Sequence, residues 1–293
     1  MLSILIVNWN TKDKLNACLS SIRTFPPNES HEVLVVDNHS TDGSAEMVAE
    51  DFPNVKLIAS DTNSGYAAGN NAAFAQASGD WLLTLNPDTE FEDDSLQMAI
   101  NELQAKKSYG ALGVRQVGPD GEVQNSVRGF PTILGVMGAL LKLDKLKPNG
   151  VWGSYTLPNF NYKSQGPAPQ PMGTFLLFRR EALEALGDPS RPFDEDFPIF
   201  FNEVDLLKRL DEAGWPCWYT PAAHVLHHHG SSTKQVKKSM IWESHKSLVR
   251  YFRKHARGLG RLPIPLVAVA SYAGAFVRAR GYHAGFRPER NDL

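Results

Sequence analysis

Apolar runs alternate with amphipathic stretches along the N-terminal part of the chain. The apolar runs end in polar residues and cover residues 2–7, 33–36, 55–58 and 81–85. Short apolar runs with such boundaries are typical of buried strands. Between them, residues recur at helical spacing after the expected N-cap Thr11, through residues 40–49 and through residues 67–77. Strands that alternate with helices predict an α/β fold with a mainly parallel sheet and right-handed crossovers.

The second part of the chain continues this pattern less regularly. Further strands are predicted at residues 111–117 and 174–178, and further helices at residues 95–107, 180–186 and 203–213. Between residues 124 and 170, periodicity fades into Gly, Pro, Asn and aromatic residues. Long irregular segments in compact domains are usually functional or mobile. We therefore expect one large α/β domain interrupted by an irregular segment.

An apolar run of 12 residues, 266–277, lies near the C-terminus and is flanked by arginines. Spanning a bilayer takes about 20 apolar residues, so this run predicts a helix that lies on an anionic membrane surface. The alternative is a helix buried in a protein core or in a homodimer contact. Nucleic acid is a third partner for the positive charge, but no recognition motif supports it, so we expect none.

Charge is divided unevenly along the 293 residues. Residues 231–293 hold 13 Lys and Arg against 3 Asp and Glu, and the remainder holds 17 against 29. The acidic part is the better place for a metal, and the basic end is expected to face an anionic partner. Cys18 and Cys217 are the only cysteines, without metal-ligand spacing, and the N-terminus is typical of a strand rather than a signal peptide. This composition favours a reducing cytoplasm.

Polar residues follow the predicted strands, and these positions carry the candidate chemistry. Asp37 ends the second strand, and the loop Asn86-Pro87-Asp88 ends the fourth. Open α/β sheets bind ligands at the carboxyl ends of their strands. A carboxylate placed there can hold a divalent metal against a diphosphate. The alternative is structural, because Asp and Asn also build turns that cap the next helix.

Five motifs together resemble the inverting glycosyltransferase family two. They are VNWN, VVDNHSTDGS, the Asn-x-Gly-x-x-x-Gly-Asn-Asn run from residue 63, LNPD and FDEDFPIFFNEVDLLKRL. The likeness covers roughly residues 2–255 and is greatest to rhamnosyltransferases of bacterial polysaccharide assembly. It implies a GT-A fold with helices on both faces of the sheet, a nucleotide-sugar donor and a divalent metal, Mg²⁺ or Mn²⁺. It also implies residues 1–232 as the GT-A domain (1–118 for the nucleotide, 119–232 for the acceptor) and residues 233–293 as a basic helical extension.

The resemblance assigns a nucleotide-binding set that comprises Asn8, Asn10, Asp37, Asn63, Gly65, Asn70 and Asn86. In similar enzymes a strand-end carboxylate lies against the base or ribose, and Asp37 matches it. The glycines are expected to let the backbone approach a ligand closely, since glycine lacks a Cβ. An Asx turn built by Asp37 and Asn38 remains the alternative.

The resemblance also assigns the metal site. Asp88 is the expected metal ligand, although Asn86 replaces the first of the family's two aspartates. His227 matches the histidine of a His-x-x-Gly-x-Ser segment that folds over the donor diphosphate, and an imidazole can ligate the metal or bond a phosphate oxygen. The alternatives are a plain turn at Asp88, a structural role for His227, or zinc, for which suitable cysteine partners are lacking.

Glu203 is the expected catalytic base. The family's acid pair before a helix reads Asn202-Glu203 here, and a carboxylate at the second position takes the proton of the acceptor hydroxyl. A capping box formed by Asn202 and Asp205 is the structural alternative. Gly173-Thr174 resembles the family's acceptor-side segment.

The expected reaction is the transfer of rhamnose from dTDP-rhamnose to a lipid-linked or growing polysaccharide. We expect this transferase in the cytoplasm, peripheral to the inner face of the cytoplasmic membrane. The alternatives are a family-two enzyme that uses a UDP- or GDP-sugar and a catalytically silent binding protein that keeps the scaffold. A dinucleotide-dependent oxidoreductase is set aside, because Asn8-Trp9-Asn10-Thr11 stands where a Gly-x-Gly-x-x-Gly turn would follow the first strand.

Overall fold

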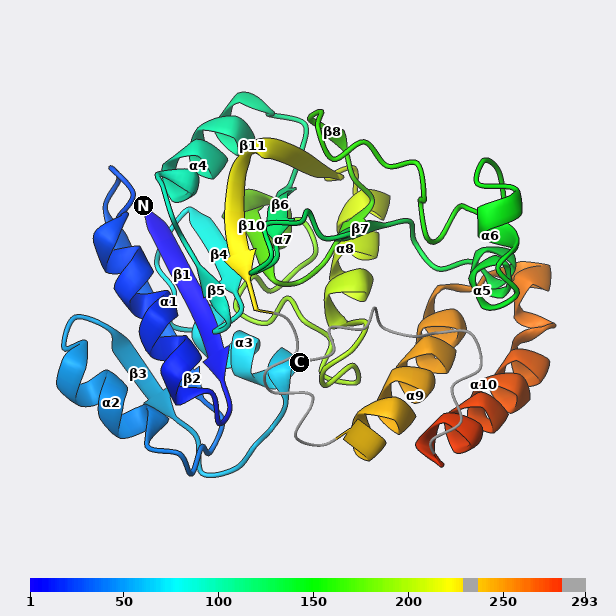
Figure 1. Cartoon of the computed structure of the whole chain (residues 1–293), viewed down its shortest axis with the longest axis horizontal. Coiled ribbons are helices and arrows are strands. Elements are labelled where there is room, and N and C mark those ends of the chain that lie inside the picture. The colour runs from blue at the N-terminus through cyan, green and yellow to red at the C-terminus, as the bar shows by residue number, and fades with distance from the viewer. Residues whose placement is uncertain (229–236, 281–293) are drawn as a thin grey trace. The chain divides into compact units, whose positions relative to one another are not determined.

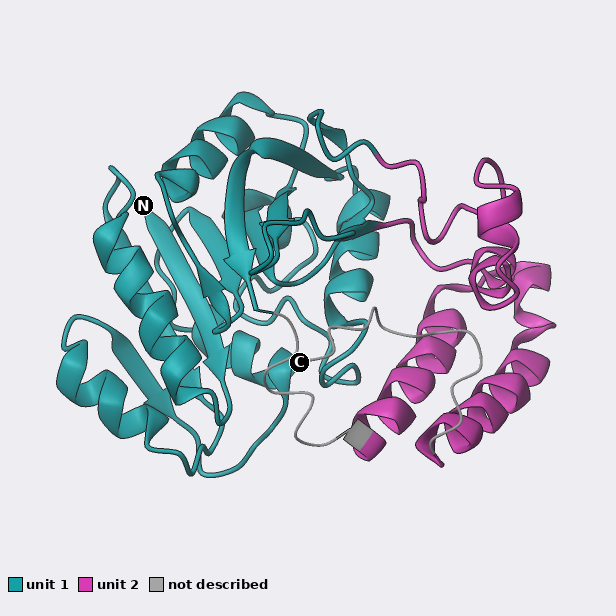
Figure 2. Cartoon of the chain, in the orientation of Figure 1, with its two compact units in different colours: residues 1–127, 161–232 teal, residues 128–160, 233–293 magenta. Residues whose placement is uncertain are grey.

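The computed structural model describes residues 1–228 and 237–280. The chain divides into two compact units, shown in Figure 2. Unit 1 comprises residues 1–127 and 161–232, and unit 2 comprises residues 128–160 and 233–293. The irregular segment of the sequence is thus split between the two units.

Unit 1 is built around a sheet that has nine strands within the described residues. Its path runs through β3 (Lys56–Ala59), β2 (His31–Asp37), β1 (Leu2–Asn8), β4 (Trp81–Leu85), β10 (Phe175–Arg179), β6 (Ala111–Val117), β11 (Cys217–His227) and β5 (Thr89–Glu90). β8 (Gly166–Pro167) pairs with β11, and β7 (Val127–Arg128) pairs with β9 (Gln170–Pro171) separately. The first four strands are parallel, as predicted, whereas β10 runs antiparallel to both of its neighbours.

The register of the parallel strands gathers their polar ends at one edge. Asn8 is opposite Asp37 in the β1–β2 pair, and Ile6 is opposite Leu85 in the β1–β4 pair. Because neighbouring parallel strands end at the same side of a sheet, the residues after β1, β2 and β4 come together there. The candidate nucleotide and metal residues therefore share this edge.

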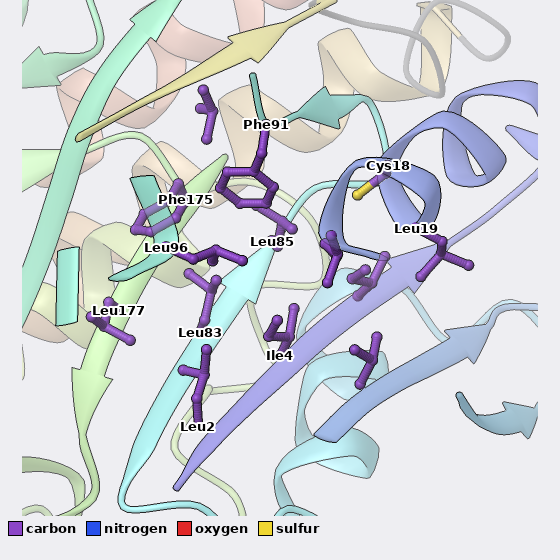
Figure 3. Close-up of a cluster of buried hydrophobic side chains, with 14 of the residues drawn as sticks. Leu2, Ile4, Cys18, Leu19, Leu83, Leu85, Phe91, Leu96, Phe175 and Leu177 are labelled. Carbon is purple, nitrogen blue, oxygen red and sulfur yellow. The ribbon is translucent and has the colours of Figure 1, made fainter. Parts of the chain in front are cut away.

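Helices connect the strands of unit 1. They are α1 (Lys12–Thr24), α2 (Ser44–Asp51), α3 (Tyr66–Phe74), α4 (Ser95–Ala105), α7 (Arg180–Glu184) and α8 (Asn202–Glu212). Every residue of β1 is buried, which is expected of a strand with both faces covered. In the core shown in Figure 3, Phe91 meets Phe175 edge to face at 6.3 Å between ring centroids. This packing supports the strand ends that carry the site.

One long strand was not predicted. β11 extends over 11 residues, and its pairing with β6 shifts register between Thr220 and His224. Pro221 lies within this shift and lacks a backbone N–H, so it interrupts both the ladder and the sequence pattern. As a result, His227 lies at the end of a sheet strand.

Unit 2 is helical in its described parts. It contains α5 (Ile133–Leu140), α6 (Leu143–Leu146), α9 (Lys237–His255), the 3₁₀ turn η2 (Gly258–Arg261) and α10 (Ile264–Ala279), and these four α-helices are labelled in Figure 1. The buried residues of α10 recur at helical spacing and are Ile264, Ala268, Ser271 and Ala275. His245 Nδ1 of α9 lies 3.0 Å from the Ser271 hydroxyl, so this face of α10 packs on α9.

The C-terminal helical stretch is longer than the apolar run in the sequence. Residues Gly258–Ala279 cover 22 residues and are, by length and composition alone, sufficient to cross a membrane. This stretch includes the 3₁₀ turn η2 as well as α10, and the helix that lies on a membrane surface stays a prediction. Within its most apolar window, 22% is buried in the structure.

Candidate active site

The ends of β1 and β2 form a connected polar cluster. The side-chain amide of Asn8 donates to Asp37 Oδ2 at 2.9 Å, and its oxygen accepts from the Thr11 hydroxyl at 2.6 Å. The other carboxylate oxygen of Asp37 accepts from the backbone N–H of Ser40 at 2.8 Å. The turn foreseen as the structural alternative is thus present. Each carboxylate oxygen has a second lone pair, so the same Asp37 keeps acceptor capacity for a base or ribose.

Asn10 braces the neighbouring loop. Its backbone is left-handed, with φ of 50°, and its side-chain oxygen accepts from the backbone N–H of Thr41 at 2.8 Å. Asparagine tolerates this conformation better than most residues. The structure gives Asn10 this loop-holding contact at the nucleotide edge.

The glycine-containing loop before α3 is held by asparagine side chains. The Asn63 side chain accepts from the Gly65 N–H at 3.0 Å, and the Asn38 amide donates to the Gly65 carbonyl at 2.9 Å. Gly65 has φ of 90°, and a Cβ there would lie 2.8 Å from the Pro198 carbonyl oxygen. Glycine is required here by packing against Pro198, whereas the sequence suggested close approach to a ligand.

Asn70 is fully buried in α3. Its amide donates to the Tyr66 carbonyl at 2.9 Å, and its side-chain oxygen has no hydrogen-bond partner within the described residues. Buried polar atoms are nearly always paired, so an unpaired one at a candidate site fits a role for a bound group.

Asn86 and Asp88 follow β4. The Asn86 N–H donates to the Thr174 carbonyl at 2.9 Å, and its own carbonyl accepts from the Thr89 hydroxyl at 2.7 Å. These bonds fix the turn that carries Asp88. The backbone carbonyl of Asp88 accepts from the His228 N–H at 3.0 Å, which ties the turn to the end of β11.

This backbone hydrogen bond places His227 next to Asp88. Nε2 of His227 lies 3.6 Å from Asp88 Oδ1, and the two residues are 2% and 6% exposed. Gln124 donates its side-chain amide to the His227 carbonyl at 3.0 Å, and its oxygen lies 2.8 Å from Nδ1. An amide oxygen only accepts, so Nδ1 carries a proton and Nε2 is the nitrogen that faces the carboxylate.

The Asp88–His227 pair fits a divalent cation. Two ligands that are each about 2.1 Å from one ion can lie up to about 4 Å apart. Metal-bound histidines usually donate their other ring N–H to an oxygen, as His227 does to Gln124. The described residues contain no group of three or more His, Cys, Asp or Glu side chains able to hold a metal. The remaining ligands would therefore be phosphate oxygens and water, as is usual for Mg²⁺.

Glu203 lies in the first turn of α8, but the predicted capping box is absent. The N-cap is Phe201, with φ of 66°, and Asn202 accepts from the Glu203 N–H at 2.6 Å. Asp205 instead forms an ion pair of 2.8 Å with Arg209. The backbone turns left-handed one residue earlier than the sequence pattern suggests, so Asn202 falls inside the helix. The capping box that would have explained Asn202 and Asp205 is therefore not formed, and the role of Glu203 as the base stays a prediction.

The environment of Glu203 changes its acidity. Burial raises its pKa from 4.5 to about 7, against the opposing effect of its own N–H and that of Val204. A Cβ on Gly173 would lie 3.5 Å from the Glu203 Cγ, so the absence of a side chain at Gly173 leaves room beside the carboxylate. A base with a pKa near neutrality is well matched to proton transfer at physiological pH.

Tyr66 contacts Gly173, the residue that lies beside Glu203. Burial raises the pKa of its phenol, and the charges of Glu203 and Asp88 raise it further. Its hydroxyl donates to the Gly173 carbonyl at 3.3 Å. Gly173 also lies beside the Glu203 side chain, and the next residue, Thr174, accepts from the Asn86 N–H in the loop that carries Asp88. Sequence reasoning missed Tyr66 and Gln124, since neither belongs to a motif with assigned chemistry.

The motifs contain two further segments, the acidic run at residues 194–196 and the histidine-containing segment at residues 227–232. Within the acidic run, Glu195 Oε1 accepts from the Asn71 side-chain amide at 2.9 Å and from the Arg191 guanidinium at 2.8 Å, so Glu195 holds the loop. Gly230 and Ser232 of the histidine-containing segment lie outside the described residues.

Comparisons with known proteins identify the family of the chain. Residues 3–187 match the family described as Glycosyl transferase family 2. An N-acetylglucosaminyl-diphospho-decaprenol L-rhamnosyltransferase of Mycobacterium tuberculosis is 30% identical over 90% of this chain and 88% of its own. Rhamnosyltransferase WbbL of Escherichia coli is 24% identical over 87% of this chain and 93% of its own.

Solved structures share the fold. A mannosyltransferase of Pyrobaculum calidifontis, in complex with GDP-Man and Mn²⁺, aligns with a TM-score of 0.58 at 18% identity over 97% of this chain and 76% of its own. TarS of Staphylococcus aureus in complex with UDP aligns with a TM-score of 0.55 at 18% identity, over 95% of this chain and 82% of its own. The architecture is the expected GT-A fold with added C-terminal helices. The chain is a glycosyltransferase and belongs to glycosyl transferase family 2.

Proposed function

We propose that this glycosyltransferase is a metal-dependent inverting enzyme that moves rhamnose from dTDP-rhamnose to a hydroxyl of a lipid-linked or growing polysaccharide. The observation that supports the proposal is that the consecutive residues Gly173 and Thr174 contact both sides of the site. Gly173 lies beside the Glu203 side chain, and the Thr174 carbonyl accepts from the N–H of Asn86 at 2.9 Å, in the loop that carries Asp88. The name of the mycobacterial relative supports rhamnose and a lipid-linked acceptor.

Glu203 acts as the general base. Its carboxylate takes the proton of the acceptor hydroxyl while the hydroxyl oxygen attacks C1 of the sugar. The C1–O bond to the diphosphate breaks, and the nucleoside diphosphate leaves with the bonding electrons. A single displacement from the opposite face inverts C1. Base catalysis of this type contributes roughly 10²- to 10⁴-fold.

Asp88 and His227 would hold a divalent cation, with Gln124 fixing the imidazole. When bound, the cation neutralises negative charge that grows on the departing diphosphate. The pair supplies one carboxylate oxygen and one imidazole nitrogen 3.6 Å apart. The carboxylate suits Mg²⁺ and Mn²⁺ alike, whereas imidazole is a ligand of transition metals, so the pair favours Mn²⁺ over Mg²⁺.

The nucleotide would bind along the neighbouring strand ends. Asp37, oriented by Asn8, accepts hydrogen bonds from the base or ribose. The loop of Asn63, Gly65 and Asn70, together with Asn86, completes this side of the site. We also place the enzyme in the cytoplasm, at the inner face of the cytoplasmic membrane, where the basic C-terminal extension meets anionic lipid.

A donor screen tests the proposal. Thermal shifts are measured with dTDP-rhamnose, UDP-sugars and GDP-sugars, each with and without Mn²⁺, and transfer is then assayed on a lipid-linked N-acetylglucosaminyl diphosphate. We expect stabilisation and transfer with dTDP-rhamnose, dependent on Mn²⁺ and with inversion at C1. Stabilisation by a UDP- or GDP-sugar alone would identify another donor. Donor binding without transfer to any acceptor would favour a silent homologue.

A further inference from the structure

Exposed apolar side chains are concentrated in unit 2. Among the described residues, 16 large hydrophobic side chains are exposed, and 13 of them lie in unit 2. They come from two segments distant in sequence, one around α5 and α6 and one around η2 and α10. Exposed apolar surface of this extent usually marks a site of interaction.

The packing of α5 turns its large side chains outward. Gly135 and Gly138 are buried, and a Cβ on Gly135 would lie 2.8 Å from the Ser154 hydroxyl oxygen. This small-residue side packs on residues 152–155. The exposed residues form what we call the leucine face, made up of Leu134, Met137, Leu140, Leu141 and Leu146. Leu146 is 77% exposed.

Positive charge accompanies the leucine face. Lys142, Lys145 and Lys147 are exposed. The one acid of residues 128–160, Asp144, is buried and accepts hydrogen bonds from the Lys145 N–H at 3.0 Å and the Thr156 hydroxyl at 2.9 Å. The segment therefore presents leucines and uncompensated lysines side by side in the sequence.

The C-terminal helices repeat this composition. Leu262 and Leu266 are each 74% exposed, on the side of the helical stretch away from its buried residues. Arg253 and Arg261 line an open hollow of about 400 Å³ whose other lining residues are Ile264 and Pro265. Two guanidinium groups beside apolar residues suit a lipid phosphate and its acyl chain.

The charge of unit 2 favours an anionic membrane over a second copy of the chain as the partner that covers its apolar surface. Unit 2 contains 17 Lys and Arg against 4 Asp and Glu, and unit 1 contains 13 against 28. Two copies meeting through unit 2 would bring +13 against +13, which is repulsive, whereas anionic lipid attracts this surface by about 1 kcal/mol for each basic residue near it. Apolar side chains among basic ones are the composition of membrane-surface elements.

We propose that unit 2 is a membrane-docking module in which the leucine face of α5 and α6 is a lipid-contacting element in addition to α10. The lipid is an anionic phospholipid. Stable anchoring generally takes two signals, and two separate apolar elements in one basic unit provide them. The inference extends the proposed membrane location, but it depends on neither the donor nor the transfer reaction.

Site-specific fluorescence tests the inference. Cys18 and Cys217 are both buried, so a thiol-reactive nitrobenzoxadiazole dye will label a cysteine introduced on the surface. Leu146→Cys reports on the leucine face, Leu266→Cys on α10, and Met98→Cys, at a position 40% exposed in unit 1, is the control. Vesicles contain phosphatidylglycerol and phosphatidylcholine, with or without spin-labelled lipid.

We expect a blue shift, and quenching by spin-labelled lipid, for the dyes at positions 146 and 266 and neither effect at position 98. Vesicles of phosphatidylcholine alone should bind the protein less. Quenching at position 266 without quenching at position 146 would overturn the role of the leucine face. Absence of quenching at both positions would overturn the module, and concentration-dependent dimerisation would then assign the surface to a second copy.

Vesicle flotation gives an independent measurement. In the combined variant Leu140→Gln, Leu141→Gln, Leu146→Gln, the partition coefficient into anionic vesicles should fall by about tenfold or more. Each substitution removes the apolar contribution of one leucine. The matched variant Met98→Gln, Val123→Gln should float like the wild type. Circular dichroism verifies that each variant is folded. Equal flotation of the triple variant and the wild type would refute the proposal. No nucleotide sugar is present, so failure here is distinct from failure of the transfer assay.

Discussion

His227 Nε2 lies 3.6 Å from Asp88 Oδ1, and both side chains are almost fully buried. The pair exists because β11 ends beside the turn after β4, where the His228 N–H donates to the Asp88 carbonyl at 3.0 Å. Gln124 then holds the other imidazole nitrogen. A histidine and a carboxylate that are this close, and oriented by a third side chain, form a prepared half of a cation site.

The first prediction concerns metal dependence. His227→Ala should raise the Mn²⁺ concentration needed for half-maximal transfer by at least tenfold, and Gln124→Ala should raise it by about 10- to 100-fold, because outer-shell partners contribute to metal affinity on that scale. His228→Ala is the matched control, since His228 pairs with Glu90 at 2.6 Å instead. A Mn²⁺ titration of the transfer rate is the measurement. An unchanged titration for His227→Ala would remove this residue from the site.

The second prediction concerns the base. Glu203→Gln should lower kcat about 10²- to 10⁴-fold and leave donor affinity nearly unchanged, because the amide keeps the shape but cannot accept the proton. Asp211→Asn lies on the same helix and pairs with Lys208 at 3.7 Å near the surface, so it should retain full activity. Steady-state kinetics and donor titration measure the two effects. Full activity of Glu203→Gln would refute the assignment.

The third prediction is a pH profile. Burial raises the pKa of Glu203 to about 7, and only the ionised form can accept a proton. The wild-type kcat/KM should therefore fall about tenfold for each pH unit below that pKa and level off above it. Rates measured with one donor and acceptor from pH 5 to 9 would reveal this limb. An activity that is flat across neutrality would contradict a base with a raised pKa.

The fourth prediction links the same group to stability. The folded pKa of Glu203 lies above its usual value of 4.5, so the folded state binds this proton more tightly than the unfolded state does. The resulting stabilisation is complete below about pH 4.5 and is lost as pH rises through about 7. At pH 8, Glu203→Gln should accordingly unfold less readily than the wild type, by on the order of 1 to 3 kcal/mol. The difference should shrink towards pH 5.

Denaturant unfolding at pH 8 and at pH 5 measures this difference. Asp211→Asn again provides the comparison, with no expected gain at pH 8. A wild type more stable than Glu203→Gln at pH 8 would mean that the carboxylate is stabilised by its surroundings, opposite to the raised pKa.

The fifth prediction separates a packing clash from backbone strain. Gly65 and Gly121 have similar left-handed backbones, with φ of 90° and 80°, but an added Cβ meets the Pro198 carbonyl at 2.8 Å only in the first case. Gly121→Ala should cost about 1 to 2 kcal/mol of stability from conformation alone. Gly65→Ala should cost more and weaken donor binding. Equal melting temperatures for the two variants would show that the loop relaxes freely.

Local pattern was enough to predict much of unit 1. The strands at residues 2–7 and 81–85 and the parallel arrangement of the first strands are confirmed, because buried strands and amphipathic helices leave a periodic record in the residues that form them. Family membership is confirmed for a related reason, since an ordered set of short motifs survives in the sequence itself. β11 was missed because Pro221 and a register shift break its period.

The sequence by itself determined the α/β order of elements, the strand-end position of Asp88 and the uneven distribution of charge. Only the tertiary structure decided that Asp88 faces His227, that Glu203 lies beside Gly173, and that burial raises the pKa of Glu203. It also decided that residues 128–160 belong with the C-terminal helices. The reason is physical: periodicity records which side of an element is buried, whereas distances and desolvation depend on segments that approach only when the chain has folded.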